Sequence, residues 1–383
     1  MQDHDPTLTY CASIYDALVQ DAVRTFQQAG DHPETLEYVV NMIYGIGRYA
    51  YHIHPGRYAD GSIENIALEI GQHSDSLLLS EYDRDVPQPD QPDTNVRRVL
   101  HVATELSANG GHARSLIGLI QQDSSSSHTV VLTSQPVHAL SPFIRDNVTV
   151  GSGQIFSLHK VRTYMGRAKA LRTLAEAWAD MVILWVYPSD PIPVIAFADC
   201  NIPPVGLMNH ADHTFWLGSA VADIIIDFRP YGSHLTKTRR NAQNTHILSL
   251  PLIPMTSVPP TRKEARRKLC IPDDVVMLCT MGTLYKYVPD NTYNFFRTAQ
   301  HILERNPNAR LYLIGMNTDQ ITSYLDPALC RDRIEGLGFI DDPSLYLTAS
   351  DIYMEGFPYN SWLALFDAVV LDVCPVLMYN PAS

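Results

Sequence analysis

The 383-residue sequence predicts an α/β protein with two doubly wound domains that follow a small helical region. Three observations predict this class. From residue 97 onward, short apolar runs alternate with helical patterns, which is typical of parallel sheets covered by helices on both faces. A stretch at 251–260 carries four Pro and divides this alternation into two parts. Hydrophobic residues make up 45% of the chain and charged residues 18%, as in proteins with sizeable cores.

Residues 1–80 form the predicted helical region. The segment 14–30 has helical spacing and ends in Gly30, a residue typical of helix C-termini. The segments 34–51 and 62–72 follow with the same spacing of apolar residues. Residues 81–96 are polar and contain three Pro, so we assign them to a linker.

We assign residues 97–255 to a first Rossmann-like domain and 256–270 to an interdomain linker. The basic run at 261–268 is typical of the solvated face of a short helix, with a phosphate or membrane-surface role as the alternative. The expected elements of the domain are strands at 97–106, 128–134, 181–190, 203–213, 222–228 and 245–254, with helices at 107–122 and 168–180.

Residues 271–383 form the second predicted Rossmann-like domain. The helix at 289–307 is expected to begin with Asp290 as its N-cap, and an apolar helix follows Pro358. A buried strand without a covering helix at 375–379 leads us to expect a truncated fragment or an unusually short member of its class. The other expected elements are strands at 274–282, 309–315, 333–340 and 351–357, and a short helix at 344–350.

Charge and cysteine usage narrow the function classes. A formal net charge of −13 argues against a general nucleic-acid binder, although it leaves room for a local basic patch. The six Cys lack a Cys-x-x-Cys pair, and Cys200, Cys279 and Cys374 lie in or beside apolar runs, which indicates reduced, buried thiols. The polar N-terminus lacks the pattern of a signal peptide, and the apolar runs are too short to span a bilayer. We expect a cytoplasmic protein with at most peripheral membrane contact.

Ligands of open parallel sheets bind at the carboxyl ends of the strands. After the first strand, Asn109, Gly110 and Gly111 precede His112 and a helix, and they form either an anion-binding turn or a mere turn. After the first strand of the second domain, Gly282 and Thr283 allow close main-chain contact. Lys286 follows and can neutralise a phosphate, unless it is simply a surface Lys.

Two further groups lie at predicted strand ends. Asn360 and Ser361 begin the apolar helix, where free N–H groups suit a diphosphate. Asp367, two turns further on, is either a satisfied structural acid or the acceptor of two ribose hydroxyls. His210, Asp212 and His213 are candidates for a general base or are structural polar residues. His-x-x-His could be half of a metal site, but a third ligand is not in evident reach, so we expect no metal.

Two segments, 279–315 and 351–379, resemble the second domain of GT-B-fold glycosyltransferases, in particular the O-GlcNAc-transferase-like family with its bacterial HMW-type protein glucosyltransferases. There, a Leu-Tyr-Lys turn follows the first strand, and the distance from Glu355 to Asp367 agrees with the family's acid-to-acid spacing. The resemblance implies two Rossmann-like domains that face a cleft. It also implies that Lys286 contacts the UDP diphosphate, that Asp367 contacts the ribose, and that Asn360 and Ser361 line the phosphate turn.

The implied activity is transfer of a hexose from a nucleotide sugar, UDP-linked, to a protein, glycan or lipid-linked acceptor, without metal or another cofactor and with inversion. Residues 109–112 would lie on the acceptor side. Lys286 and helix amides would stabilise the leaving diphosphate, with His210 or Asp212 as the base, and domain closure would exclude water.

The sequence departs from these families at one turn. Where the family has Asn-Gly-His-Thr-Thr, this chain has Asn360, Ser361, Trp362, Leu363 and Ala364. The Glu-x7-Glu pattern of retaining enzymes is also broken, because Leu363 stands eight residues after Glu355. These departures leave open a non-catalytic sugar-nucleotide-binding or scaffold protein, and a different GT-B enzyme such as a sugar-nucleotide epimerase or phosphorylase.

Overall fold

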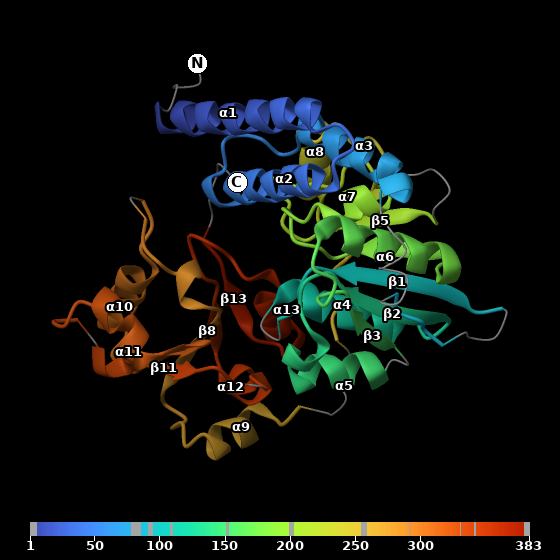
Figure 1. The fold of residues 1–383 in the computed structure, drawn as a ribbon. Coiled ribbons are helices and arrows are strands. Elements are labelled where there is room, and N and C mark those ends of the chain that lie inside the picture. Colours follow the sequence, from blue (N-terminus) through green and yellow to red (C-terminus); the bar gives the residue numbers. More distant parts are fainter. Residues whose placement is uncertain are drawn as a thin grey trace. The chain divides into compact units, whose positions relative to one another are not determined.

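A computed structural model of the chain shows two α/β units (Figure 1). The compact units are Met1–Pro254 and Met255–Ser383, and each contains its own sheet. The residues described are 6–77, 86–90, 95–107, 110–150, 153–198, 203–253, 259–290, 292–329, 331–340 and 342–378.

Three N-terminal helices begin the first unit: α1 (Pro6–Ala29), α2 (Pro33–Ile53) and α3 (Gly61–Leu77). As predicted, Gly30 terminates α1: it directly follows Ala29 and adopts a left-handed φ of +53°. The three helices share one apolar core with the sheet of this unit. Gly71 of α3 lies so close to α7 that a Cβ there would be 2.3 Å from the carbonyl oxygen of Ile195. The helical region is therefore an integral part of the first unit.

The first sheet is fully parallel, with strand order β3-β2-β1-β4-β5-β6-β7. The order reverses between β1 and β4, which is the switch point where doubly wound sheets bind ligands. The strands are β1 (Arg97–Ala103), β2 (Ser126–Leu132), β3 (Gln154–Ser157), β4 (Met181–Leu184), β5 (Val205–Asn209), β6 (Ile224–Asp227) and β7 (Thr245–Ile247). Several are shorter than predicted, because apolar residues such as Trp185 and Val186 continue into buried loops.

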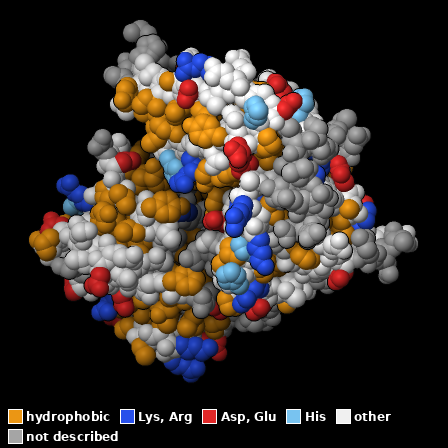
Figure 2. All heavy atoms as spheres, viewed as in Figure 1, with side chains coloured by type: hydrophobic (Ala, Val, Ile, Leu, Met, Phe, Trp, Pro, Cys, Tyr) orange, Lys and Arg blue, Asp and Glu red, His pale blue; other side chains and the backbone are white. Residues whose placement is uncertain are grey.

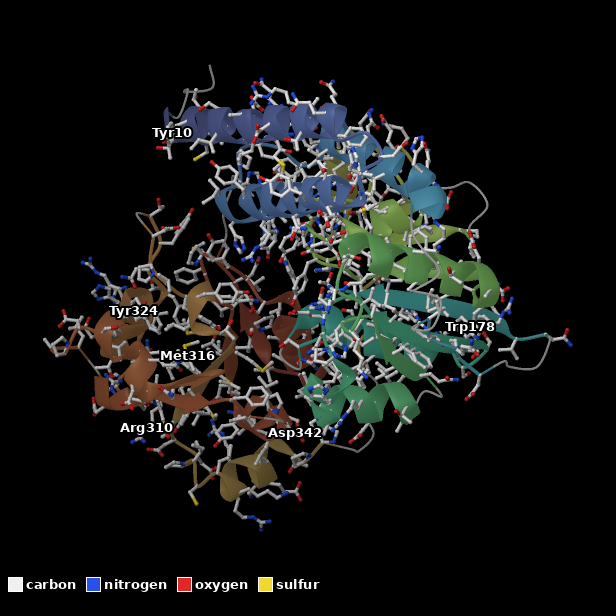
Figure 3. The ribbon with its side chains drawn as sticks, in the orientation of Figure 1. Tyr10, Trp178, Arg310, Met316, Tyr324 and Asp342 are labelled. Atoms are coloured by element: carbon white, nitrogen blue, oxygen red, sulfur yellow. The ribbon has the colours of Figure 1, made fainter. Side chains whose placement is uncertain are left out.

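Helices cover both faces of this sheet (Figure 1). Trp178, at the end of α6 and labelled in Figure 3, is buried, and its Nε1 donates to the carbonyl oxygen of Asp90 at 3.1 Å. The sequence predicted α4 and α6 but missed α5, α7, α8 and strand β3. The helices are α4 (Gly111–Gln122), α5 (Pro142–Val150), α6 (Tyr164–Trp178), α7 (Ile192–Ala196) and α8 (Pro230–Arg239), with a 3-10 turn η2 (Val137–Ala139).

A relay of rings crosses the buried sheet of the first unit. The indole Nε1 of Trp185 donates to Nδ1 of His101 at 3.1 Å, and Nε2 of His101 lies 3.0 Å from Nδ1 of His128. His128 Nε2 then donates to the carbonyl oxygen of Asp123 at 2.9 Å. Because an indole only donates, this chain of bonds requires both imidazoles to be neutral. Burial, aided by the neighbouring His128, lowers the pKa of His101 to about 3.

The relay predicts that the protein loses stability in acid. The unfolded state takes up a proton at the ordinary His pKa near 6.5, whereas folded His101 resists protonation down to about pH 3. Stability is therefore retained above pH 6.5 and falls between pH 6.5 and 3, by up to about 1.4 kcal/mol per pH unit for this group. His101→Gln, which does not titrate, is expected to unfold in urea with a smaller loss between pH 7 and 5 than the wild type. An equal loss in both proteins would contradict this assignment.

The second sheet has the order β10-β11-β9-β8-β12-β13, and its pairs are parallel except β10 with β11. Here the order reverses between β8 and β12, which places the switch point between them. The strands are β8 (Val276–Met281), β9 (Ala309–Ile314), β10 (Met316–Asn317), β11 (Ile334–Gly338), β12 (Ile352–Met354) and β13 (Cys374–Val376).

The helices of the second unit are α9 (Arg262–Lys268), α10 (Phe295–Arg305), α11 (Thr318–Ile321), α12 (Ser344–Ala349) and α13 (Trp362–Val370), with 3-10 turns η3 (Leu284–Lys286), η4 (Thr322–Tyr324) and η5 (Arg331–Arg333). Met316 and Tyr324, labelled in Figure 3, belong to its core, where Tyr324 stacks on Phe296 with ring centroids 5.3 Å apart. Helix α9 lies within 256–270, the segment assigned to a linker, and Arg266 Nε donates to the carbonyl oxygen of Ala349 in α12 at 3.1 Å.

Three local predictions in this unit were wrong. Asn294 caps α10, because its side chain accepts from the N–H of Arg297 at 3.0 Å, whereas Asp290 accepts from the loop amide of Thr292 at 2.7 Å. Cys374 is exposed, since β13 is an edge strand that pairs only with β12. A buried strand was also expected at 375–379. The part of it that lies in β13, Pro375 and Val376, is exposed for the same reason. Cys279 is buried, and Cys200 lies outside the described residues.

Candidate functional site

Three predicted site residues of the second unit meet at the switch point between β8 and β12. Lys286 ends the 3-10 turn that follows β8, and its side chain reaches the start of α13. Its Nζ donates to Oγ of Ser361 at 2.9 Å and to the carbonyl oxygen of Asn360 at 3.2 Å. Burial lowers the pKa of Lys286, and the charge of Glu355 opposes this shift. The structure thus brings Lys286, Asn360 and Ser361 together, although they lie far apart in the sequence.

Glu355 holds the start of α13 beside Lys286. It follows β12, its side chain is only 4% exposed, and its Oε1 accepts the backbone N–H of Ser361. Its Oε2 is buried without a hydrogen-bond partner among the described residues. Burial raises the pKa of Glu355, while the Ser361 N–H and the Lys286 charge lower it. The carboxylate therefore holds Ser361, the N-cap residue of α13, in place and attracts the Lys286 ammonium.

Gly282, directly after β8, lies close to Tyr287 and to the start of α13. A Cβ at this position would lie 3.0 Å from Oη of Tyr287 and 3.2 Å from Oγ of Ser361. Tyr287 is fully buried, and its hydroxyl lies 2.8 Å from Oγ1 of Thr280. The carbonyl oxygen of Thr283 accepts a hydrogen bond from the N–H of Lys286 at 3.0 Å, which closes the turn. The sequence analysis missed Tyr287, although it stands beside Lys286 in the Leu-Tyr-Lys-Tyr run.

Asp367 lies on α13 but is half-buried rather than buried as expected. The apolar helix is not buried on all sides, because Trp362, Val369 and Val370 are exposed. Six residues separate Asp367 from Ser361, which corresponds to about 9 Å along the helix. The proposed contact of Asp367 with a ribose stays a prediction.

In the first unit, Asp190 organises the carboxyl edge of the sheet. Its buried carboxylate accepts from Oγ1 of Thr104 at 2.6 Å, from Oγ1 of Thr133 at 2.7 Å and from the N–H of Ile192 at 3.0 Å. These partners follow β1, β2 and β4, so one carboxylate ties three loops together. The sequence analysis missed Asp190, because its partners lie 57 and 86 residues away.

Two predicted histidines meet at this edge. The rings of His112, in α4, and His210, directly after β5, stack with centroids 5.0 Å apart and an interplanar angle of 21°. His112 Nε2 donates to the carbonyl oxygen of Glu105 at 2.9 Å, which leaves its Nδ1 as an acceptor in the neutral ring. The rings of Trp216 and His210 pack edge to face, with centroids 4.8 Å apart. Burial lowers the pKa of both histidines, and His112 lowers that of His210 further.

His210 also carries a buried Nδ1 without a hydrogen-bond partner among the described residues. Asp212, by contrast, is engaged: Arg229 donates from Nε and Nη2 to its two oxygens at 2.6 and 2.8 Å. Although burial alone would raise it, these bonds hold the pKa of Asp212 well below its usual range. His213 is exposed, and its carbonyl oxygen accepts from His54 Nε2 at 2.8 Å. Of the three residues proposed for catalysis, His210 is the one with a buried ring nitrogen that lacks a partner among the described residues.

The glycine turn of the first unit is placed only in part. Gly110 precedes α4, and its N–H donates to the carbonyl oxygen of Ser107 at 2.8 Å, while Gly111 is the exposed first residue of the helix. Asn109 lies outside the described residues. Across the described ranges, the structure contains no group of three or more His, Cys, Asp or Glu placed to hold a metal ion. Within those ranges, no helix has the length and apolar character needed to cross a membrane.

Comparison with known proteins identifies the fold. No protein-family model and no curated protein sequence matches the chain. Among solved structures, an O-GlcNAc transferase mutant from Thermobaculum terrenum is 16% identical, with a TM-score of 0.50 over 98% of this chain and 83% of that one. Anabaena HepE, in complex with UDP and glucose, is 12% identical, with a TM-score of 0.51 over 73% of this chain and 80% of that one. A Rickettsia africae glycosyltransferase is 8% identical, with a TM-score of 0.53 over 74% and 79%.

The chain has the GT-B fold. The predicted class is confirmed: two Rossmann-like units with parallel sheets and a helical N-terminal region, similar to solved GT-B glycosyltransferases.

Proposed function

We propose that this GT-B chain transfers a sugar from a nucleotide-sugar donor, UDP-linked, to a protein, glycan or lipid-linked acceptor. The observation that carries the proposal is the convergence of the Lys286 ammonium and the start of α13 at the switch point of the second sheet. A helix N-terminus and a half-buried cation together suit a diphosphate. The complexes of HepE with UDP and glucose and of Staphylococcus aureus TarM with UDP support the choice of donor.

The donor would be held by the second unit. Lys286 would turn from Ser361 toward the diphosphate as a point charge, and main-chain N–H groups at the start of α13 would replace the missing His and Thr side chains of the family. Asp367, further along the same helix, would accept the ribose hydroxyls. Glu355 would keep the helix start in place through the Ser361 N–H.

The acceptor would be bound by the first unit. In a single inverting displacement, the bond between the anomeric carbon and the diphosphate oxygen breaks as the acceptor oxygen bonds to that carbon. The acceptor proton passes to His210, whose Nδ1 lacks a hydrogen-bond partner among the described residues. Burial lowers the pKa of this ring, which keeps it neutral near pH 7 but also makes it a weaker base. Lys286 and the helix amides stabilise the charge that develops on the diphosphate, so the reaction proceeds without a metal ion.

The proposal is tested by binding and turnover of the intact chain. UDP is expected to bind in calorimetry, and one of a panel of UDP- and GDP-sugars is expected to release nucleotide, with unchanged rates in EDTA. Binding without transfer or hydrolysis would favour the non-catalytic alternative. A change of the donor sugar without release of UDP would indicate an epimerase. Absence of binding to every nucleotide in the panel would overturn the proposal.

A further inference from the structure

The segment around β3 and the start of α6 has an unusual charge for this acidic chain. Between Asp146 and Glu176, the sequence contains five Lys or Arg residues and His159, but no Asp or Glu. The chain as a whole has a net charge of −13. Local accumulation of cations on such a chain favours a specific anionic partner over general electrostatic attraction.

The fold places three of these cations, Lys160, Arg162 and Arg167, at the carboxyl edge of the first sheet, whereas Arg172 is buried and donates to the carbonyl oxygens of Gly71 and Ile195. Strands β2 and β3 are paired, so the loops that follow them are neighbours. His138, after β2, and His159, after β3, lie edge to face with ring centroids 6.4 Å apart. Oγ of Ser157 lies 3.0 Å from Nδ1 of His159, which orients that ring.

Arg167 folds back from α6 onto the same loop. Its Nε donates to the carbonyl oxygen of Val161 at 2.7 Å, and its Nη2 lies 3.5 Å from the carbonyl oxygen of His159. Lys160 and Arg162, between these points, are exposed and form no ion pair within the described part of the chain. We call His138, His159, Lys160, Arg162 and Arg167 the cationic loop. Lys, Arg and His side chains gather in a strip on the face shown in Figure 2.

The acids near this loop already have partners. Glu37 of α2 accepts the N–H groups of Tyr164 and Met165 at 2.6 and 3.0 Å, which satisfies the N-terminus of α6. Asp190 is buried and bonded to Thr104 and Thr133. The helix N-terminus is therefore occupied by a carboxylate, and the charge available to a ligand comes from the side chains of the cationic loop.

We propose that the cationic loop binds phosphate groups carried by the acceptor. Arg donates two parallel hydrogen bonds to a phosphate, and Lys adds a point charge, so an Arg and a Lys beside two histidine rings suit this group. The loop lies at the same carboxyl edge of the parallel sheet as His112, which follows the neighbouring strand β1, and His210, which follows β5. The proposal rests on the proposed function only in naming the bound molecule an acceptor.

The test compares two double variants with equal loss of charge. Lys160→Gln with Arg162→Gln removes two cations from the loop, and Lys263→Gln with Arg267→Gln removes two exposed cations from α9 of the second unit. With the donor site saturated by UDP, calorimetry with inorganic tripolyphosphate is expected to show binding about tenfold weaker in the first double variant and unchanged in the second. Acceptor-independent release of UDP from the donor is expected to be unchanged in both, which separates this test from that of the proposed function.

Further probes distinguish the source of the phosphate. Sedimentation with phosphatidylglycerol vesicles, beside phosphatidylcholine vesicles, would assign the phosphate to a membrane-borne acceptor if the loop variant lost both vesicle and tripolyphosphate binding. Loss of tripolyphosphate binding alone would assign it to a soluble acceptor. Equal weakening in the two double variants, vesicle binding without tripolyphosphate binding, or equally tight loop-dependent binding of polyglutamate would overturn the proposal.

Discussion

Lys286→Met is expected to lower the rate of UDP release from the donor by about 100-fold or more, the usual effect of removing one group that stabilises charge in a transition state. Met keeps the length and apolar stem of the side chain, so the turn after β8 is retained while the ammonium that bonds Ser361 is lost. Because the diphosphate gains charge as it leaves, the loss should fall mainly on kcat rather than on KM. Steady-state kinetics with the preferred donor provides the measurement.

Lys268→Met is the matched control for this variant. Lys268 is an exposed residue of α9 in the same unit, so the same substitution there should leave the rate unchanged. If the two variants lost activity equally, or if Lys286→Met kept the wild-type rate, the assignment of Lys286 to the diphosphate would be wrong. Unchanged thermal unfolding of both variants would show that the comparison reports chemistry.

Gly71→Ala is expected to destabilise the first unit by about 3 kcal/mol, at the upper end of the usual cost of overpacking. The added Cβ would lie 2.3 Å from the carbonyl oxygen of Ile195 and 2.6 Å from Cβ of Ala198, and the first of these is rigid backbone. Helix α3 would have to move away from α7 and strain the bonds by which Arg172 joins Gly71 to Ile195. Thermal unfolding should shift down by roughly 5–10 °C.

The control for this prediction is another helix-interior glycine. Gly45 of α2 has no atom within 4 Å of the position that a Cβ would take. Gly45→Ala should therefore stabilise the chain by about 0.5–1 kcal/mol through the higher helix propensity of Ala. If both substitutions changed stability in the same direction by similar amounts, the close packing of α3 on α7 would not explain the result.

The elements that sequence reasoning found are those with a strong local pattern. Helix α6 and strand β9 carry apolar residues at the spacing of their own structure, and Gly30 ends α1 through its backbone freedom. Helix α8 was missed, because its sequence contains few apolar residues and its burial comes from neighbours far along the chain. Strand β3 was missed because it is only four residues long and half-buried.

In the candidate site, too, some features could be predicted from a local sequence pattern and others could not. Lys286 and Ser361 could be predicted, since each follows an apolar strand and parallel strands place their carboxyl ends at one edge. The exposure of Cys374 could not be predicted, because it depends on β13 being the edge strand of its sheet.

By itself, the sequence determined the alternation of strands and helices, the division into two α/β units and the reactive side chains at the strand ends, because these features depend on residues within one or two turns of each other. Only the tertiary structure decided which of those side chains meet. The Lys286 ammonium reaches Ser361 across 75 residues, Arg229 engages Asp212, and His112 stacks on His210. Such contacts depend on strand order and on the burial that packing creates, and neither property is written in the local pattern of the chain.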